Sequence, residues 1–304
     1  MIKIIIGDEN VGKRVDKIIR KSLPFCPLGE IFRLFRNGKI LLNGKKIKEN
    51  ARAESGEIQI LADEDELRKK CAQKQKVESK NKLQIIYEDE NLLVCDKPVS
   101  VAVQSGKGIL AGTSLIEMAQ NYAEQKFIPH LAHRIDSDTS GLVLIAKNVE
   151  FLRKIQNIWD SELLKKEYLA LCHEIFEKKT GKIELNLEKN GLKMNVVKNG
   201  GQRCVSHFKV LCENKNFSLV CVKIETGRMH QIRAQLAHIN HNILGDKKYG
   251  DEFADKELEK DLGIKIERLM LHSYKISFVL EKKRYAFEAQ IPNVFGKFGN
   301  FSIS

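Results

Sequence analysis

A polar loop, His133-Arg134-Ile135-Asp136-Ser137-Asp138-Thr139-Ser140-Gly141, runs directly into an apolar strand, Leu142-Val143-Leu144-Ile145-Ala146. A loop that feeds a buried strand holds its side chains on a rigid support, which suits a functional site. Asp and Ser also satisfy backbone donors in ordinary turns, so a capped turn is an equal alternative on local chemistry alone. One His and two Asp would also suit a metal or phosphatase site.

A second cluster, Thr226-Gly227-Arg228-Met229-His230-Gln231-Ile232-Arg233, combines cations with a helix start. Gly227 is expected to break the preceding strand, with a helix beginning directly after it. Arg228 and His230 at such an N-terminus would hold phosphate. Arg233 lies one turn further along the helix, and a buried arginine there needs an acidic partner. The alternative is a surface helix with ordinary cations.

The chain from residue 83 onward is predicted to form an α+β domain. Strand-like runs recur, and several follow one another by short turns instead of alternating strictly with helices. That pattern is typical of a mixed, largely antiparallel sheet flanked by helices. The expected strands are Leu83–Tyr87, Leu92–Asp96, Leu142–Ala146, Tyr168–Cys172, Phe217–Ile224, Leu269–Phe278 and Arg284–Ile291, and the expected helices are Val149–Leu164 and Met229–Ile239.

Residues 1–62 are predicted to form a separate, small α/β domain. A helix is expected at Lys13–Leu23, where apolar residues recur at helical spacing, and a second at Leu28–Arg36. Asn43-Gly44 between two short strand-like runs is a strong hairpin signal. A strand at Glu57–Leu61 closes this domain.

The first domain is strongly basic. Residues 9–62 hold 12 Lys and Arg against 6 Asp and Glu, so they carry half of the net charge of +12. Clustering of this kind favours contacts with phosphates. The almost wholly polar residues 63–82 are interpreted as a linker to the domain at 83–304. The candidate phosphate contacts of the first domain are Lys13, Lys17, Arg20, Lys21, Arg33, Arg36, Lys45 and Lys46.

The composition argues against several classes of protein. A net charge of +12 over 304 residues favours an anionic partner, either nucleic acid or a membrane surface. The seven cysteines form no C-x-x-C pair, which argues against a disulfide framework or a zinc site and for a reducing compartment. No apolar stretch approaches the ~18 residues of a membrane span, and the N-terminal apolar run is too short for a signal peptide. We therefore expect a cytoplasmic protein without a membrane partner.

Both clusters resemble motifs of the RluA-type pseudouridine synthases. Residues 133–141 are similar to the signature H-R-L-D-x-x-T-S-G, and residues 226–233 to T-G-R-T-H-Q-I-R. Other motifs follow in the family's order over residues 83 to 292: Tyr87-Glu88-Asp89-Glu90 with Asp96-Lys97-Pro98, Lys166-Glu167-Tyr168-Leu169-Ala170, Leu244-Gly245-Asp246 with Tyr249-Gly250, and Leu271-His272. Ser137, Met229 and Gln235 depart from the pattern, where Arg, Thr and His are usual.

Residues 9–62 resemble an S4 domain, the small RNA-binding module fused to many such enzymes. The likeness rests on Arg14-Val15-Asp16-Lys17 and Gly38-Lys39-Ile40-Leu41-Leu42-Asn43-Gly44. The two resemblances together imply isomerisation of uridine to pseudouridine in RNA. The expected partner is 23S ribosomal RNA of the large subunit, or its precursor. No cofactor and no metal is implied, and a monomer is expected.

The resemblance also implies roles for individual residues. Asp136 would detach uracil from ribose, either by attacking the base or by removing a sugar proton through a glycal. Arg233 would be its guanidinium neighbour, and Tyr168 would lie against the uracil ring. Arg134 would fill the gap that the flipped nucleotide leaves in the RNA stack.

Two other classes of protein stay open on sequence alone. An RNA-binding assembly factor with an inactive catalytic domain would bind ribosomal RNA without isomerising it, and the intact set of Asp136, Tyr168 and Arg233 argues against this class. A metal-dependent hydrolase would use His133, Asp136 and Asp138 and would lose its activity to chelators. No further ligand group of suitable spacing supports that class.

Overall fold

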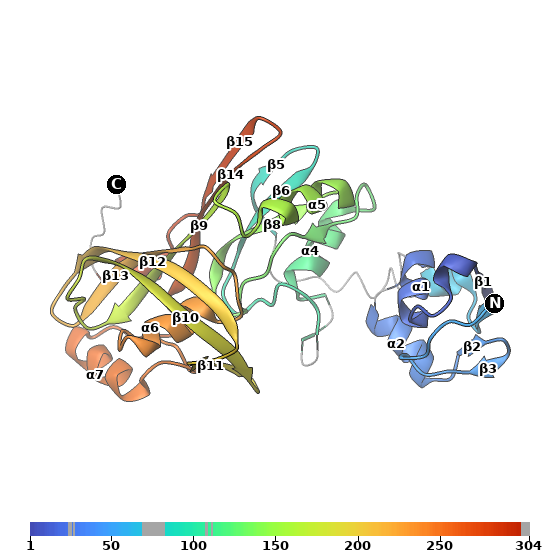
Figure 1. The fold of residues 1–304 in the computed structure, drawn as a ribbon, viewed down its shortest axis with the longest axis horizontal. Coiled ribbons are helices and arrows are strands. Elements are labelled where there is room, and N and C mark those ends of the chain that lie inside the picture. Colours follow the sequence, from blue (N-terminus) through green and yellow to red (C-terminus); the bar gives the residue numbers. More distant parts are fainter. Residues whose placement is uncertain (24–25, 27, 69–82, 107–108, 111, 299–304) are drawn as a thin grey trace. The chain divides into compact units, whose positions relative to one another are not determined.

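The computed structural model describes residues 1–23, 26, 28–68, 83–106, 109–110 and 112–298. The chain divides into two compact units, Met1–Glu78 and Ser79–Ser304, and each is described by itself (Figure 1). The division falls within the polar stretch 63–82 that was interpreted as a linker. Residues 69–82 of that stretch lie outside the described residues.

The first unit is a four-stranded antiparallel sheet with helices, in the strand order β1-β4-β2-β3. The predicted helices and the predicted hairpin are both present, and the turn at Asn43 and Gly44 has positive φ at both residues. The elements are β1 (Ile2–Ile6), the 3-10 helix η1 (Asp8–Asn10), α1 (Val15–Ser22), α2 (Leu28–Arg36), β2 (Ile40–Leu42), β3 (Lys45–Lys46) and β4 (Gly56–Ile60).

Helix α1 is amphipathic, as its sequence predicts. Val15, Ile18 and Ile19 are buried in the core of the unit, while the lysine and arginine side chains of the opposite face are exposed. Leu67 is buried in the same core. The first unit therefore continues beyond residue 62, where the sequence had placed its end.

The second unit is built on a mixed, largely antiparallel sheet, which confirms the predicted α+β class (Figure 1). The main path of the sheet is β11-β10-β12-β13-β9-β14-β8-β6-β5, with β15 paired to β14 and β7 paired to β8. The strands are β5 (Gln84–Glu88), β6 (Leu92–Lys97), β7 (His130–Leu131), β8 (Ser140–Ala146), β9 (Leu164–His173), β10 (Thr180–Asn190), β11 (Lys193–Val197), β12 (Gln202–Glu213), β13 (Phe217–Ile224), β14 (Leu271–Leu280) and β15 (Lys283–Glu288).

Strand β8 lies between β14 and β6, and helices cover both of its faces. One face packs against Phe151 and Ile155, and the other against Leu115 and Met118. Residues 142–146 are fully buried as a result, which explains the uninterrupted apolar run. The helices of this unit are α4 (Leu115–Ala123), α5 (Val149–Ile158), α6 (Gln231–His238), α7 (Glu252–Leu262) and α8 (Asn293–Gly296).

The parallel pairing of β8 with β14 fixes the end of the polar loop beside β14. Ser140 pairs with His272 and Gly141 with Ser273. Gly141 has φ of +108°, and a Cβ there would lie 2.2 Å from the Ser273 carbonyl oxygen. Only glycine allows this close approach, so the last residue of the signature is required by the backbone.

Some elements differ from the sequence-based expectation. The helix predicted at Val149–Leu164 ends at Ile158, and the chain turns over residues 159–163 before strand β9 begins at Leu164. Strands β10 to β12 and helices α4 and α7 were not anticipated.

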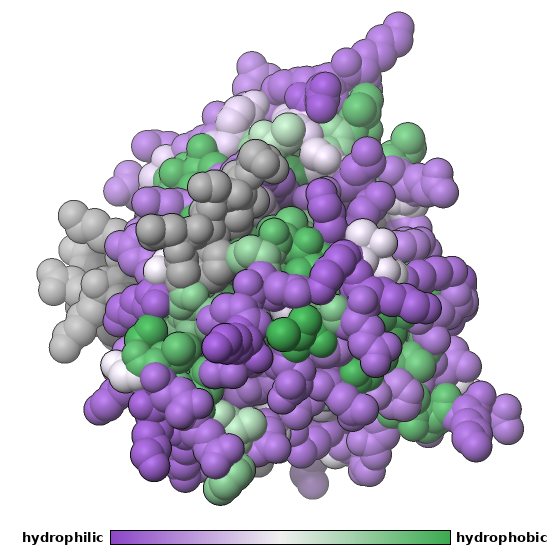
Figure 2. Space-filling view, turned by 90° about the vertical axis from the view of Figure 1, so that its left-hand side faces the viewer, coloured by the Kyte–Doolittle hydropathy of each residue, from purple (hydrophilic) through white to green (hydrophobic). Residues whose placement is uncertain are grey.

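The end of the unit at β10, β13, α6 and α7 presents a mostly hydrophilic face, with hydrophobic side chains in small separate groups (Figure 2). Within the described residues, no helix is long and apolar enough to cross a membrane.

Candidate active site

Asp136 and Arg233 form an ion pair between the polar loop and helix α6. Arg233 donates from Nη1 to Asp136 Oδ2 at 2.9 Å, and the side chains are 3% and 25% exposed. The structure thus joins the two clusters that the sequence singled out. Arg233 is buried, as expected for an arginine on the inner side of this helix.

The acidic partner that a buried arginine requires is Asp246. Arg233 donates from Nε to Asp246 Oδ2 at 2.7 Å and from Nη2 to Oδ1 at 2.6 Å, a bidentate pair. The backbone N–H groups of Lys248 and Tyr249 also donate to Oδ1. Asp246 lies in one of the family motifs, but no role was predicted for it from the sequence. The sequence feature that could have revealed this role is the need of a buried Arg233 for a carboxylate partner.

Burial and ion pairing have opposite effects on the pKa values of Arg233 and Asp246. Burial disfavours the charged form of Arg233, but its hydrogen bonds with Asp246 and Asp136 outweigh burial and raise the pKa of the guanidinium. Burial also raises the pKa of Asp246, yet Arg233 and the two backbone donors outweigh it and hold that pKa below its ordinary value. Arg233 is therefore a fixed cation between two carboxylates.

Helix α6 is fastened to the sheet by two buried amides. Gln231 donates to the Val205 carbonyl at 3.1 Å and to Ser206 Oγ at 3.0 Å. Gln235 donates to the carbonyls of Ile183 and Cys204 and accepts from Ser206 Oγ at 2.6 Å. Gln235, which departs from the family pattern, is thus fully used in holding the helix that carries Arg233.

Asp136, Tyr168, Arg233 and Arg134 line one cavity of about 240 Å³. Tyr168 is on β9 and only 7% exposed. Burial, together with the nearby charge of Asp136, raises the pKa of Tyr168 to about 12, so its phenol keeps its proton at neutral pH. Arg134 is exposed at the mouth of the cavity.

Lys97, at the end of β6, holds the loop that carries Asp136. Its Nζ donates at 2.8 Å to each of three carbonyl oxygens, those of Pro98, Val101 and Ser137. The side chain is fully buried, and burial lowers the pKa of Lys97 to about 7 against the opposing charge of Asp138. Ser137 departs from the family pattern, but its contribution here is a backbone carbonyl.

His133 has a structural contact that competes with metal binding. Its Nε2 accepts from the backbone N–H of Leu144 at 3.0 Å, and its ring stacks on Trp159 with centroids 4.5 Å apart. Burial lowers the pKa of His133 to about 3. Asp138 is exposed. No group of three or more His, Cys, Asp or Glu side chains in the described part of the chain is arranged to hold a metal ion.

The other predicted cations of this unit lie near the same cavity. Arg228 lines it, is 40% exposed, and places Nη2 3.6 Å from Asp160 Oδ2. His230 occupies the N-cap position of α6 without a capping hydrogen bond from its side chain, and its Nε2 lies 3.7 Å from Asp136 Oδ2. The His230 side chain is only 8% exposed, so it faces Asp136 more than solvent.

In the first unit, most of the predicted phosphate contacts are exposed. Arg33 differs, because its Nε donates to Glu30 Oε2 at 2.9 Å and its Nη2 donates to the other carboxylate oxygen. Arg33 therefore already has a carboxylate partner. The exposed residues are Lys13, Lys17, Arg20, Lys21, Arg36, Lys45 and Lys46.

Comparison with known proteins identifies the family. Residues 91–238 match the family described as RNA pseudouridylate synthase. The ribosomal large subunit pseudouridine synthase C of Buchnera aphidicola subsp. Schizaphis graminum (strain Sg) is 32% identical over 287 residues, which cover 91% of this chain and 88% of that protein. The chain belongs to the RNA pseudouridylate synthase family. The likeness to RluA-type enzymes that the motifs indicated is thereby confirmed.

Other pseudouridine synthases named C give the same result. That of Escherichia coli (strain K12) is 32% identical, over 91% of this chain and 88% of its own length. That of Vibrio cholerae serotype O1 is 30% identical, and the match covers 95% of this chain and 92% of that protein. Within the family, Ala102-Val103-Gln104-Ser105-Gly106-Lys107-Gly108 and the run from Tyr249 to His272 also resemble this group of synthases in sequence.

Solved structures show the same fold for the pseudouridine synthase unit. Human RNA Pseudouridylate Synthase Domain Containing 4 has a TM-score of 0.59 at 22% identity, covering 70% of this chain and 90% of that chain. Human RNA Pseudouridylate Synthase Domain Containing 1 has a TM-score of 0.57 at 20% identity, covering 69% of this chain and 84% of that chain.

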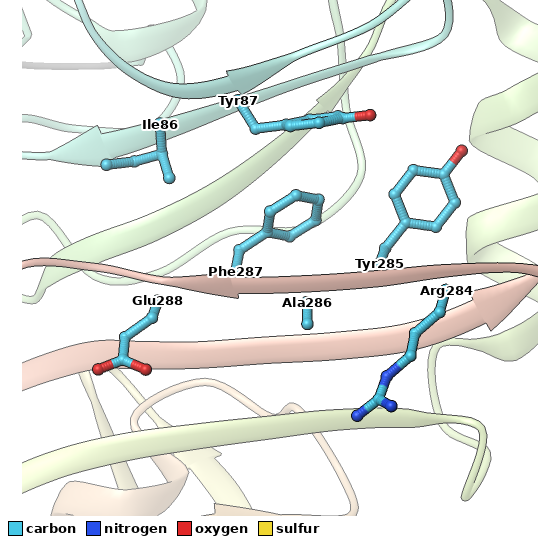
Figure 3. Close-up of a pocket in the computed structure, with 7 residues that line it drawn as sticks. All are labelled: Ile86, Tyr87, Arg284, Tyr285, Ala286, Phe287 and Glu288. Carbon is cyan, nitrogen blue, oxygen red and sulfur yellow. The ribbon is translucent and has the colours of Figure 1, made fainter.

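A second cavity, of about 260 Å³, lies between β5 and β15, and none of the predicted site residues lines it. Tyr87, Tyr285 and Phe287 point toward one another there, while Arg284 and Glu288 extend from the opposite side of β15 (Figure 3). The three rings pack against one another at centroid distances of 5.1 to 6.4 Å and form one wall of this cavity.

Proposed function

We propose that this RNA pseudouridylate synthase acts on 23S ribosomal RNA of the large subunit, or on its precursor, with Asp136 as the catalytic residue. The observation that carries the proposal is the ion pair of Asp136 with buried Arg233, at the wall of a cavity that Tyr168 also lines. The relatives named for the large ribosomal subunit support the choice of RNA.

The isomerisation has a simple atomic balance. The bond between N1 of uracil and C1′ of ribose breaks, and a bond between C5 and C1′ forms. C5 loses its hydrogen as a proton, and N1 gains one, so no electron acceptor is required. Asp136 starts the reaction either by attacking the base or by removing a sugar proton, and Arg233 holds the carboxylate in place for both routes.

Tyr168 and Arg134 position the nucleotide in this proposal. The Tyr168 ring lies against the flipped uracil, where an aromatic face and a protonated hydroxyl suit a base. Arg134, exposed at the mouth, takes the place that the base leaves in the RNA stack. Arg228 is exposed near the N-terminus of α6, where we place a phosphate of the same strand, whereas the buried His230 side chain faces Asp136.

The first unit serves as an S4-like RNA-binding domain in this account. Its exposed basic helix α1 supplies affinity through phosphate contacts, while the chemistry stays in the second unit. We further propose that the protein works in the cytoplasm as a monomer and without a cofactor. A sedimentation measurement with and without RNA tests the oligomeric state.

The RNA target is tested by mapping pseudouridines in cells that lack the gene. The expected result is that specific uridines of 23S ribosomal RNA lose the modification, and that the wild-type gene restores it while Asp136→Asn does not. Unchanged 23S ribosomal RNA, with sites lost from another RNA, would show that the proposed substrate is wrong.

A further inference from the structure

His230 is placed to act on Asp136. It lines the same cavity, and its Nε2 lies 3.7 Å from the Oδ2 atom to which Arg233 also donates. Its backbone has φ of +51°, a left-handed conformation that residues other than glycine seldom adopt and that often marks a functional site. Among the described residues, the other carboxylate oxygen of Asp136 receives no hydrogen bond.

Tyr249 holds the other nitrogen of the His230 ring. The distance from Tyr249 Oη to His230 Nδ1 is 3.0 Å, and the two rings meet edge to face with centroids 5.5 Å apart. The Tyr249 hydroxyl oxygen also accepts from the backbone N–H of Met194, on β11, at 2.6 Å. Because the oxygen is used as an acceptor there, its own proton is free to be donated to Nδ1.

This arrangement selects one tautomer of neutral His230. If Nδ1 carried the proton, Nε2 would present a lone pair to the negatively charged Asp136 carboxylate, which is unfavourable. If Tyr249 donates to Nδ1, the ring proton resides on Nε2 and points toward Asp136. The hydrogen-bond chain therefore runs from the Met194 backbone through Tyr249 and His230 to Asp136.

We infer that His230, oriented by Tyr249, is a positioning residue for Asp136: its Nε2–H donates to Oδ2 and leaves Oδ1 as the reacting oxygen. The inference rests on the proposed role of Asp136. A separation of 3.7 Å shortens to a hydrogen bond when RNA closes the pocket, as hydrogen bonds in empty active sites often do.

His230 orients the carboxylate as a neutral donor. Four charged groups face it: Asp136 from the loop before β8, Arg233 on its own helix, and Asp246 and Lys248 from the loop before α7. Burial lowers the pKa of His230, with Arg233 and Lys248 acting in the same direction and the two carboxylates opposing. A hydrogen bond to the unprotonated Nδ1 stabilises the neutral form further. Protonation of the ring at acid pH reverses the hydrogen bond with Tyr249 and places a second cation beside Asp136, which lowers the basicity of its carboxylate.

The activity test uses a large-subunit ribosomal RNA transcript labelled with tritium at C5 of uridine, in single turnovers with saturating enzyme. Tyr249→Phe should slow tritium release about tenfold without weakening RNA binding, equivalent to about 1.4 kcal/mol in the barrier. It should also move the acid limb of the pH profile to higher pH, because His230 then protonates more easily. In a His230→Gln background, Tyr249→Phe should not shift the acid limb of the pH profile, because the imidazole that titrates is absent. Tyr122→Phe removes another bonded hydroxyl and is the matched control.

A measurement without RNA keeps the inference separate from the substrate proposal. Nitrogen-15 NMR of the imidazole rings should show His230 as the Nε2–H tautomer, with a pKa that rises in Tyr249→Phe. An Nδ1–H tautomer overturns the inference, even if the RNA substrate proves to be another one. The inference is also overturned if Tyr249→Phe has the same pH profile as the wild type. It is overturned as well if Tyr249→Phe still shifts the acid limb in the His230→Gln background. If Tyr249→Phe does not fold, His230→Gln should still be at least about tenfold faster than His230→Ala, because an amide retains the donor.

Discussion

Arg233 binds Asp136 and Asp246 with the same guanidinium, although Asp136 lies 97 residues earlier in the chain. Two nitrogens of the guanidinium form the bidentate pair with Asp246, and the third donates to Asp136. The position of Asp136 Oδ2 is thus set by an arginine that a second, fully hydrogen-bonded carboxylate holds in turn. This coupling connects the stability of the second unit with its proposed chemistry.

Removing the supporting carboxylate should destabilise the protein. Asp246→Asn leaves Arg233 buried with one carboxylate, and loss of a partner from a buried pair costs roughly 3–5 kcal/mol. Urea unfolding followed by circular dichroism measures this change in the free energy of unfolding. Glu252→Gln, at an 85% exposed carboxylate, is the control and should change it little. A loss below about 1 kcal/mol, the value typical of exposed pairs, would contradict the buried pair.

The same pair should make stability depend on acid pH. The pKa of Asp246 in the folded protein is below its ordinary value, so the unfolded chain binds the proton more tightly. The stabilisation is therefore fully present above the unfolded value of about 3.9 and is lost as pH falls through the lower, folded value. Unfolding free energies measured from pH 6 downward should fall less steeply in Asp246→Asn. Equal slopes in the two proteins would rule out this source.

Gly141→Ala should disturb both folding and turnover. A Cβ at this position would lie 2.2 Å from the Ser273 carbonyl oxygen, and φ of +108° is unfavourable for alanine. Backbone strain of this kind costs about 1–3 kcal/mol, and relief of the clash would move the loop that carries Asp136. Gly29→Ala, in helix α2 with no atom within 4 Å of the new Cβ, is the control and should be neutral or stabilising. A thermal melt and a tritium-release assay compare the two, and equal behaviour would refute the steric argument.

The basic helix of the first unit should act on affinity alone. Changing exposed Lys13, Lys17, Arg20 and Lys21 to Gln should weaken binding of ribosomal RNA. Each lost phosphate contact lowers the salt slope by about 0.7 to 0.9. The control changes four exposed lysines of the second unit, Lys126, Lys215, Lys256 and Lys260. Binding and turnover at several salt concentrations test this division, and a large fall in kcat with unchanged KM would oppose it.

The sequence predicted those parts of the site whose signal is local. The loop at Asp136 borders an apolar strand, and the helix at Arg233 follows a glycine, so both elements were recognisable. The contact between this loop and this helix was predicted only through the family resemblance. The fold that creates it depends on distant pairings, such as that of β8 with β14, which joins residues more than 130 positions apart. Residue types and spacing carry no information about such a pairing.

Other features were missed for identifiable reasons. Strand β10 alternates apolar Ile183, Leu185 and Leu187 with polar residues, a detectable pattern that was not used. Tyr249 was not assigned a role, because its partners are a backbone N–H of β11 and a histidine ring. Contacts with backbone atoms leave no trace in side-chain patterns. The same holds for the three carbonyls that bind Lys97.

The most direct test of the account is tritium release from C5-labelled 23S ribosomal RNA by Asp136→Asn. Formation of pseudouridine must release the hydrogen from C5, so the assay reports the isomerisation itself. Wild-type protein should release tritium, Asp138→Asn should release it at a mildly reduced rate, and Asp136→Asn should release none while binding the RNA as tightly. Release by Asp136→Asn within about tenfold of wild type, a difference of about 1.4 kcal/mol, would contradict the catalytic role of Asp136.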